Sequence, residues 1–170
     1  NGKGDYLPGV PEDFANGPKK ATSYMGKVAA LLYARYEAGE KPVAMVSMDN
    51  CSHNGDKLYA AVNTFAEKWA ENGVAEEGFK AYINDASKVS FPWSMIDKIT
   101  PRPDASVEAI LKADGVEELE PVVTSKNTWV APFVNAEETE YLVIEDAFPN
   151  GKPEVLTKAG LMFTERETVD

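Results

Sequence analysis

Cysteine and histidine occur only once each in this 170-residue sequence, as Cys51 and His53. A lone cysteine excludes an internal disulfide, which agrees with a reducing compartment, and we expect the protein to be cytoplasmic. Structural zinc sites use two separate pairs of ligands, and one cysteine with one histidine cannot supply the second pair. We therefore expect no bound metal, although Asp49 places a carboxylate near Cys51 and His53.

Positive charge is also scarce. The 17 lysine and arginine side chains face 28 aspartate and glutamate side chains, which gives a formal net charge of -11. Affinity for nucleic acid depends largely on Lys and Arg neutralising phosphates, so this balance opposes nucleic-acid binding. No apolar run approaches the ~20 residues that a membrane-spanning helix needs. We expect neither a nucleic-acid nor a membrane partner, whereas 44% hydrophobic residues suffice for a folded core.

Glycine and proline mark the start of the sequence as irregular. Several of both fall within residues 1–19, which predicts surface chain that builds no core. The pair Gly2 and Gly4 is the only one that resembles a dinucleotide-binding loop. It fails on context, because no strand precedes it and no helix follows promptly.

Helical and extended patterns alternate from residue 20 onward, which is typical of an α/β fold. An amphipathic helix is expected over residues 20–38, with an apolar face of Tyr24, Val28, Leu31, Leu32 and Tyr36. The apolar run over residues 42–48 predicts a buried parallel strand that feeds a polar loop at residues 49–55. A second helix follows, with Asn54 as a candidate cap and an apolar repeat of Leu58, Val62, Phe65 and Trp69.

The remainder predicts smaller elements. We expect a short helix over residues 76–86, an extended segment over residues 89–99, and a helix capped by Asp104 or Ser106. Four β-rich runs then predict short, partly antiparallel strands, at residues 122–123, 128–130, 141–144 and 161–164. This pattern indicates an irregular segment at 1–19, an α/β part at 20–120 and an appended β-rich part of the same domain at 121–170.

Two segments carry a resemblance to a known family. The stretch Phe-Pro-Trp-Ser-Met-Ile-Asp-Lys-Ile-Thr-Pro at residues 91–101, and Val-Ser-Met-Asp-Asn-Cys-Ser-His-Asn-Gly at residues 46–55, resemble the two signatures of the mannitol dehydrogenase and fructuronate reductase family. The resemblance continues to about residue 165. It implies the later part of a Rossmann-like domain that binds NAD or NADP. It also implies hydride transfer to or from a sugar alcohol or sugar acid, with mannitol and fructose or mannonate and fructuronate as the leading pairs.

The resemblance assigns roles to polar residues of the first signature. Asn50 stands where the family has an asparagine that polarises the reacting carbonyl, and a neutral amide donor there stabilises alkoxide character. The alternative is a loop asparagine that caps the next helix or forms a turn. Ligands of parallel sheets bind beyond the carboxyl ends of the strands, so we expect Asp49 and His53 at the cofactor site.

Asp97 lies in the second signature and is the candidate for binding substrate hydroxyls. The family's usual pattern has valine before this aspartate and arginine after it, whereas this sequence has Ile96 and Lys98. Lysine cannot form the planar two-donor fork of arginine, which puts any bidentate contact there in doubt. The alternative is a structural carboxylate that pairs with Lys98 or caps backbone amides.

The glycine-rich phosphate loop and the catalytic lysine motif of the family do not occur in these residues. We therefore expect an internal piece of a larger dehydrogenase, which alone neither binds cofactor tightly nor turns over substrate. The alternative is a non-catalytic carbohydrate-binding or regulatory α/β module. An extracellular binding protein is a third alternative, which the absence of disulfides and of a leader disfavours.

Overall fold

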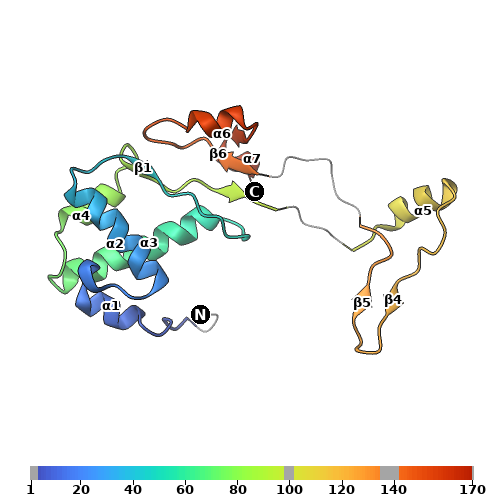
Figure 1. The fold of residues 1–170 in the computed structure, drawn as a ribbon, viewed down its shortest axis with the longest axis horizontal. Helices are drawn as coiled ribbons and strands as arrows, with labels where there is room; N and C mark the ends of the chain where they lie inside the picture. Colours follow the sequence, from blue (N-terminus) through green and yellow to red (C-terminus); the bar gives the residue numbers. More distant parts are fainter. Residues whose placement is uncertain (1–3, 98–101, 135–141, 170) are drawn as a thin grey trace. The chain divides into compact units, whose positions relative to one another are not determined.

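The computed structural model describes residues 4–97, 102–134 and 142–169 (Figure 1). It divides the chain into two units. The first contains residues Asn1–Ile96 and Leu142–Asp170, and the second contains Asp97–Tyr141. The boundary expected at residue 120 therefore falls inside the second unit, because the chain leaves the first unit after Ile96 and returns to it at Leu142.

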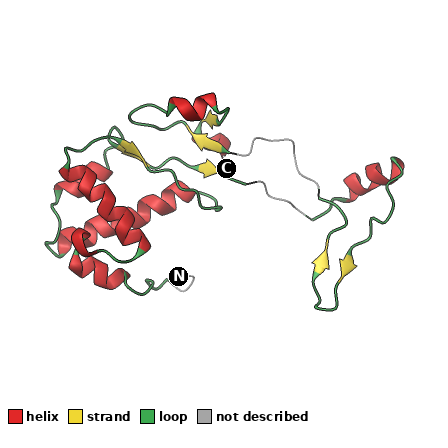
Figure 2. Ribbon diagram, in the orientation of Figure 1, coloured by secondary structure: helices red, strands yellow, loops and turns green. Residues whose placement is uncertain are grey.

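Helices are the main regular structure of the first unit (Figure 2). The five helical segments before residue 84 are α1 (Val10–Asn16), the 3-10 turn η1 (Pro18–Lys20), α2 (Tyr24–Glu37), α3 (Asn54–Glu71) and α4 (Gly78–Ile83). Helix α3 contacts α1, α2 and α4, so it is the central helix of this group. Its buried face carries Val62, Phe65, Ala66 and Trp69, which confirms the apolar repeat expected there.

The core of this helical group is rich in aromatic rings. Tyr33 meets Phe79 edge-on with ring centroids 5.1 Å apart, and Trp69 meets Phe65 at 5.4 Å. The rings of Trp69, Phe79 and Tyr82 are almost completely inaccessible to solvent. Such edge-to-face pairs add to the stabilisation from burial itself, which is about 25 cal/mol per Å² of apolar surface.

The expectation of irregular chain over residues 1–19 is wrong for residues 10–16, which form helix α1. Phe14 is 7% exposed and packs on Phe65 at 4.8 Å, so this segment does contribute to the core. The indole Nε1 of Trp69 donates to the carbonyl oxygen of Asp13 at 2.8 Å. The glycines and prolines here serve as helix boundaries: Pro11 lies in the first turn, and Gly9 precedes the helix in the left-handed region.

Helix α2 confirms the expected helix, but its buried face differs from the one predicted. Leu32 and Tyr33 are buried, whereas Tyr24 is 89% and Leu31 is 74% exposed. Gly26 is also buried on this helix, where it lies against the Asp13 carboxylate. A Cβ on Gly26 would lie 2.4 Å from an Asp13 carboxylate oxygen, so only glycine lets this turn of α2 approach the carboxylate.

Short strands complete the first unit. Strand β1 (Val43–Ala44) pairs in parallel with β2 (Val89–Ser90), with Val43 opposite Val89. A three-stranded sheet has the order β3 (Ser94–Met95), β6 (Val143–Glu145) and β7 (Met162–Thr164). Strand β6 runs antiparallel to β3 and parallel to β7, with helix α6 (Glu154–Lys158) between them and α7 (Arg166–Val169) after them. Within the described residues this confirms short, partly antiparallel strands.

The second unit is small. Helix α5 (Ala105–Ala113) is capped by Asp104, whose carboxylate accepts from the backbone N–H of Ser106 at 2.8 Å. Strands β4 (Val122–Val123) and β5 (Trp129–Val130) form an antiparallel pair. The helices and strands together confirm an α/β chain. None of the helices in the described part of the chain is both long and apolar enough to cross a bilayer.

Candidate functional site

The candidate site is the loop that follows strand β1. This strand and its partner β2 are parallel, and ligands of parallel sheets lie beyond the carboxyl ends of the strands. The backbone N–H of Met45 donates to Ser90 O at 2.8 Å and extends the pairing by one residue. After it the chain turns into the loop and enters helix α3 at Asn54.

Asn50 lies in this loop with its side chain exposed to solvent. Its amide makes no hydrogen bond to any residue that the structure describes, so it neither caps helix α3 nor closes an Asx turn there. The neighbouring carbonyl of Asp49 accepts from the backbone N–H of Cys51 at 3.0 Å, which folds the loop tightly around Asn50. An exposed amide on a folded loop is available to a ligand.

Asp49 is also exposed, and its backbone N–H donates to Ser47 Oγ at 3.3 Å. The thiol of Cys51 donates to Asp49 Oδ2 at 3.6 Å. Among the residues that the structure describes, no three histidine, cysteine, aspartate or glutamate side chains come close enough together to hold a metal ion.

His53 immediately precedes helix α3 and adopts the left-handed conformation, with φ of 54°. Its imidazole stacks on the indole of Trp93, with ring centroids 4.2 Å apart and planes 17° from parallel. A non-glycine residue with positive φ is uncommon. In this conformation the imidazole of His53 can stack on Trp93. His53 therefore lies at the end of the loop with one ring face on Trp93, and its place at a cofactor site stays a prediction.

Trp93 is itself held at three points. Its backbone N–H donates to Glu145 Oε2 at 2.9 Å, and its indole Nε1 donates to Asp56 Oδ1 at 3.0 Å. The Arg166 guanidinium lies 4.9 Å from the indole centroid and also bonds Glu145 Oε1 at 2.9 Å. The hydrogen bond to Glu145 raises the pKa of Arg166 against the opposing effect of its partial burial. This charged group fixes the aromatic surface on which His53 stacks.

The prediction that Asn54 caps helix α3 is wrong. Asn54 is 2% exposed, and its side chain is not a helix cap, since helix α3 has no side-chain cap. Its Nδ2 donates to Asp49 O and to Ser94 O, both at 2.9 Å, while its Oδ1 accepts from Ser94 N at 3.0 Å. The hydroxyl of Ser94 also donates to Ser47 O. The only sequence signal for this role is the position of Asn54 at the junction of the loop and the helix. A capping residue would occupy the same position, so the sequence does not distinguish the two roles.

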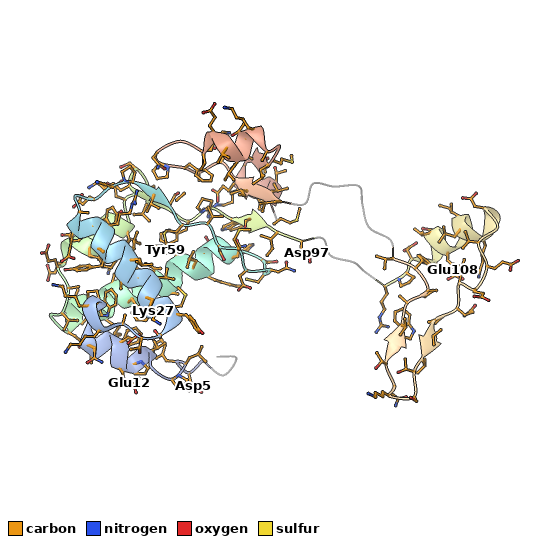
Figure 3. The ribbon with its side chains drawn as sticks, viewed as in Figure 1. Asp5, Glu12, Lys27, Tyr59, Asp97 and Glu108 are labelled. Atoms are coloured by element: carbon orange, nitrogen blue, oxygen red, sulfur yellow. The ribbon has the colours of Figure 1, made fainter. Side chains whose placement is uncertain are left out.

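These side-chain bonds join the two signature segments, although strands β1 and β3 belong to different sheets. Strand β1 pairs with β2, and Ser94 contacts Ser47 directly. Asp97 is exposed and is the first residue of the second unit, and its role in binding substrate hydroxyls stays a prediction (Figure 3). The contrast drawn between Lys98 and the family's arginine concerns a residue outside the described ones.

The exposed side chains of the loop differ in their chemistry. Asp49 carries a negative charge, which opposes phosphate groups, and its carboxylate is a good acceptor for hydroxyl groups. Asn50 offers an amide donor, and the stacked rings of His53 and Trp93 offer a flat surface. The loop therefore combines a hydroxyl acceptor, an amide donor and an aromatic stack within one short segment.

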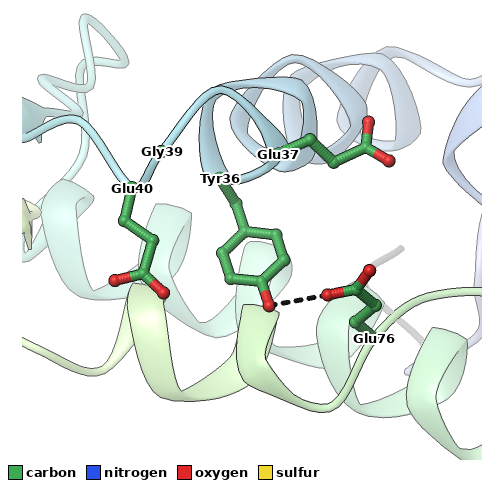
Figure 4. Close-up of a pocket in the computed structure, with 5 residues that line it drawn as sticks. All are labelled: Tyr36, Glu37, Gly39, Glu40 and Glu76. Atoms are coloured by element: carbon green, nitrogen blue, oxygen red, sulfur yellow. Dashed lines mark hydrogen bonds between the residues drawn. The ribbon is translucent and has the colours of Figure 1, made fainter.

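A separate hollow of about 550 Å³ lies at the end of helix α2 (Figure 4). Three carboxylates line it, from Glu37, Glu40 and Glu76, together with the ring of Tyr36. The Tyr36 hydroxyl donates to Glu76 Oε2 at 2.9 Å, and this bond raises the pKa of Tyr36. The hollow contains none of the residues predicted to act on a ligand, and its charge repels phosphates.

Comparisons with known proteins identify chains that are similar to this one. The chain is 48% identical over 168 residues to the D-mannonate oxidoreductase of Thermotoga maritima, covering 98% of this chain and 31% of that protein. It is 36% identical over 157 residues to a mannitol 2-dehydrogenase of Pyrenophora tritici-repentis, covering 92% of this chain and 24% of that protein. The chain thus spans less than a third of the length of these curated relatives.

Solved structures give the same result. The substrate-free D-sorbitol dehydrogenase superposes with a TM-score of 0.58 at 26% identity, over 95% of this chain and 29% of that one. The Pseudomonas fluorescens mannitol 2-dehydrogenase, in a ternary complex with NAD and D-mannitol, superposes with a TM-score of 0.54 at 28% identity, over 93% and 28%. The family model of the mannitol dehydrogenase Rossmann domain matches residues 13–157. The chain therefore belongs to the mannitol dehydrogenase family and forms part of its Rossmann domain.

Proposed function

We propose that this chain is part of a nicotinamide-dependent dehydrogenase that interconverts a secondary alcohol of a sugar acid and the corresponding ketone. The leading pair is mannonate and fructuronate. The 48% identity to a D-mannonate oxidoreductase, against 36% to a mannitol 2-dehydrogenase, supports the sugar acid over the polyol. The lone Cys51 supports a cytoplasmic enzyme.

The observation that carries the proposal is the exposed amide of Asn50 beyond the carboxyl end of the parallel strand β1. During carbonyl reduction, negative charge builds on the oxygen as hydride reaches the carbon. A preorganised N–H donor from Asn50 stabilises that charge, and one such donor is worth about 3 kcal/mol. The nicotinamide cofactor, NAD or NADP, supplies or accepts the hydride when bound.

The other predicted residues take supporting roles in this proposal. Asp49 accepts hydroxyl groups of the cofactor ribose, and His53 borders the cofactor from its stack on Trp93. Asp97 accepts hydroxyl groups of the sugar. A polyol is the second candidate substrate, because the family includes a mannitol 2-dehydrogenase solved with NAD and D-mannitol.

The test is an assay of a full-length protein that contains this chain. Oxidation of mannonate and of mannitol is followed through the absorbance of reduced cofactor, with NAD and NADP each offered in turn. We expect turnover, with the higher kcat/KM for mannonate. A higher value for mannitol makes the polyol the substrate. Absence of turnover with every sugar acid and polyol leaves the non-catalytic carbohydrate-binding module as the better explanation.

The isolated 170-residue chain is the matched control in the same assay. The phosphate loop and the catalytic lysine motif of the family do not occur in it, so it is expected to show no turnover. Measurable turnover by the isolated chain contradicts the assignment of these functions to other parts of the enzyme.

A further inference from the structure

Asn54 joins three parts of the first unit through one buried side chain. Its amide reaches the loop at Asp49 O and the strand β3 at Ser94 O, while it stands at the first residue of helix α3. Both Nδ2 hydrogens and the Oδ1 atom have partners, so the amide is fully satisfied at 2% exposure. A polar side chain that is buried and fully bonded has one orientation, because any other leaves a buried group unpaired.

The bond to Asp49 O acts on the peptide that precedes Asn50. A peptide unit is planar, so the carbonyl oxygen of Asp49 and the nitrogen and Cα of Asn50 move as one body. The same oxygen also accepts from Cys51 N at 3.0 Å. Two bonds to one carbonyl oxygen fix the plane and hence the point from which the Asn50 side chain leaves the backbone.

The hydrogen bonds of Asn54 form a clamp that links the loop at Asp49 to helix α3 and to strand β3. Helix α3 and strand β3 are both held rigidly. Helix α3 runs for 18 residues and buries Val62, Phe65 and Trp69 in the core. Ser94 pairs with Ile144 in the antiparallel ladder of β3 and β6. The side chain of Asn54 therefore relates the exposed loop to one helix and one sheet at the same time.

We propose that Asn54 is a positioning residue for the dehydrogenase reaction, holding the Asp49–Asn50 peptide so that the amide of Asn50 meets the reacting carbonyl. The inference rests on the proposed function of Asn50. Asn54 itself is buried and touches neither substrate nor cofactor, so its effect passes through Asn50. A catalytic group displaced by about 1 Å loses on the order of a hundredfold in rate, which sets the scale of the expected effect.

The test is a double-variant cycle in the full-length enzyme with Asn54→Ala, Asn50→Ala and both together. Asn54→Ala is expected to lower kcat by about ten- to a hundredfold, with less change in either KM. In the Asn50→Ala background the same change is expected to lower kcat no further, because no amide remains to be positioned. The fall in Tm caused by Asn54→Ala is expected in both backgrounds.

Asn72→Ala is the matched control. Asn72 lies at the other end of helix α3, and its Nδ2 donates to Phe14 O at 2.8 Å. It is expected to lower Tm while kcat stays unchanged. Asn54→Asp is the second variant, for the case that Asn54→Ala does not fold. It keeps the acceptor for Ser94 N and replaces the donor to Asp49 O by a carboxylate oxygen, so it is expected to lower kcat as Asn54→Ala does.

Two results overturn the proposal. One is an Asn54→Ala enzyme that keeps the wild-type kcat when it is assayed at a temperature well below its own Tm. The other is a loss of kcat that multiplies fully with the loss from Asn50→Ala, since independent effects mean that Asn54 does not act through Asn50.

Hydrogen exchange separates this inference from the proposed function. The amide of Ser94 is protected by Asn54 Oδ1, so its exchange is expected to accelerate in Asn54→Ala and not in Asn72→Ala. Exchange in the peptide over residues 47–50 is expected to rise with it. If the wild-type enzyme oxidises no substrate, the proposed function fails. Independently of that result, unchanged exchange at Ser94 in Asn54→Ala overturns the proposal that Asn54 holds this segment.

Discussion

The carboxylate of Asp13 accepts a 2.7 Å hydrogen bond from the backbone N–H of Ser23, the residue that caps helix α2. It also accepts from the backbone N–H of Thr22 at 2.9 Å and from the Thr22 hydroxyl at 3.1 Å. Asp13 is completely buried. Its burial raises its pKa, but the hydrogen bonds from Ser23 and Thr22 outweigh burial and hold the pKa below its ordinary value.

Asp13→Asn is expected to destabilise the protein by about 1–3 kcal/mol near pH 7. The amide nitrogen of asparagine cannot accept a hydrogen bond, so at least one backbone N–H that now donates to the carboxylate would lose its acceptor. Because the folded pKa is lowered, the ionised carboxylate stabilises the fold above the unfolded pKa of about 3.9, and this stabilisation is lost as the pH falls through the folded pKa. The difference between wild type and variant therefore narrows in acid. Urea unfolding of both proteins at a series of pH values measures this difference in the free energy of unfolding.

The exposed neighbour Glu12 provides the control for this prediction. Glu12→Gln removes a carboxylate from the same helix without removing a buried acceptor. It is expected to change the unfolding free energy by less than about 0.5 kcal/mol across the pH series. An Asp13→Asn variant that unfolds like Glu12→Gln at every pH would show that the Asp13 hydrogen bonds contribute nothing net.

Gly55→Ala tests the close packing of helix α3 on the segment before strand β3. A Cβ at Gly55 would lie 2.3 Å from Phe91 O and 2.8 Å from Pro92 O, and backbone carbonyls cannot move aside independently. We expect a loss of about 1–3 kcal/mol, as for other overpacked sites. Thermal unfolding of the variant gives the measurement.

Gly78→Ala is the comparison, because Gly78 also lies in the first turn of a helix. A Cβ at Gly78 would lie 2.4 Å from the Tyr36 hydroxyl, which is the far end of a side chain that can rotate. The loss is expected to be smaller than for Gly55→Ala. Equal losses of stability at both positions would mean that the backbone at Phe91 moves aside as easily as the side chain of Tyr36.

The helices were the most predictable part of the fold, because their apolar repeats are long. The repeat of Leu58, Val62, Phe65 and Trp69 indicated α3, and Gly73, with φ of 64°, lies in the turn beyond the end of the helix. Helix α1 was missed because seven residues show little periodicity, and because Gly9 and Pro11 bound a helix here instead of a loop. The exposure of Tyr24 and Leu31 on α2 could not be predicted, because which apolar side chains of a helix are covered depends on tertiary packing that a local pattern does not encode.

The site shows the same division. The position of Asn50 after a parallel strand followed from the order of apolar and polar residues. The role of Asn54 did not, because an asparagine at the start of a helix is ordinarily a cap. Its partner Ser94 is forty positions away, and only the fold brings the two together.

Asn50→Ala in the full-length enzyme tests the proposed catalytic amide. Turnover is expected to fall by about a hundredfold or more, since the lost interaction strengthens in the transition state, while cofactor affinity changes little. Steady-state kinetics gives the turnover number, and fluorescence titration gives the cofactor Kd. A variant with unchanged turnover would return Asn50 to a structural role in its loop.

Asp97→Asn tests the proposed substrate contact. An uncharged amide accepts hydrogen bonds from sugar hydroxyls more weakly than a carboxylate does, so KM for the sugar is expected to rise by about tenfold, equivalent to ~1.4 kcal/mol. The cofactor KM is expected to stay the same. Asp114→Asn is the control, since Asp114 is an exposed aspartate of the second unit at the end of helix α5. If Asp97→Asn lowers Tm and leaves both KM values unchanged, Asp97 is a structural carboxylate.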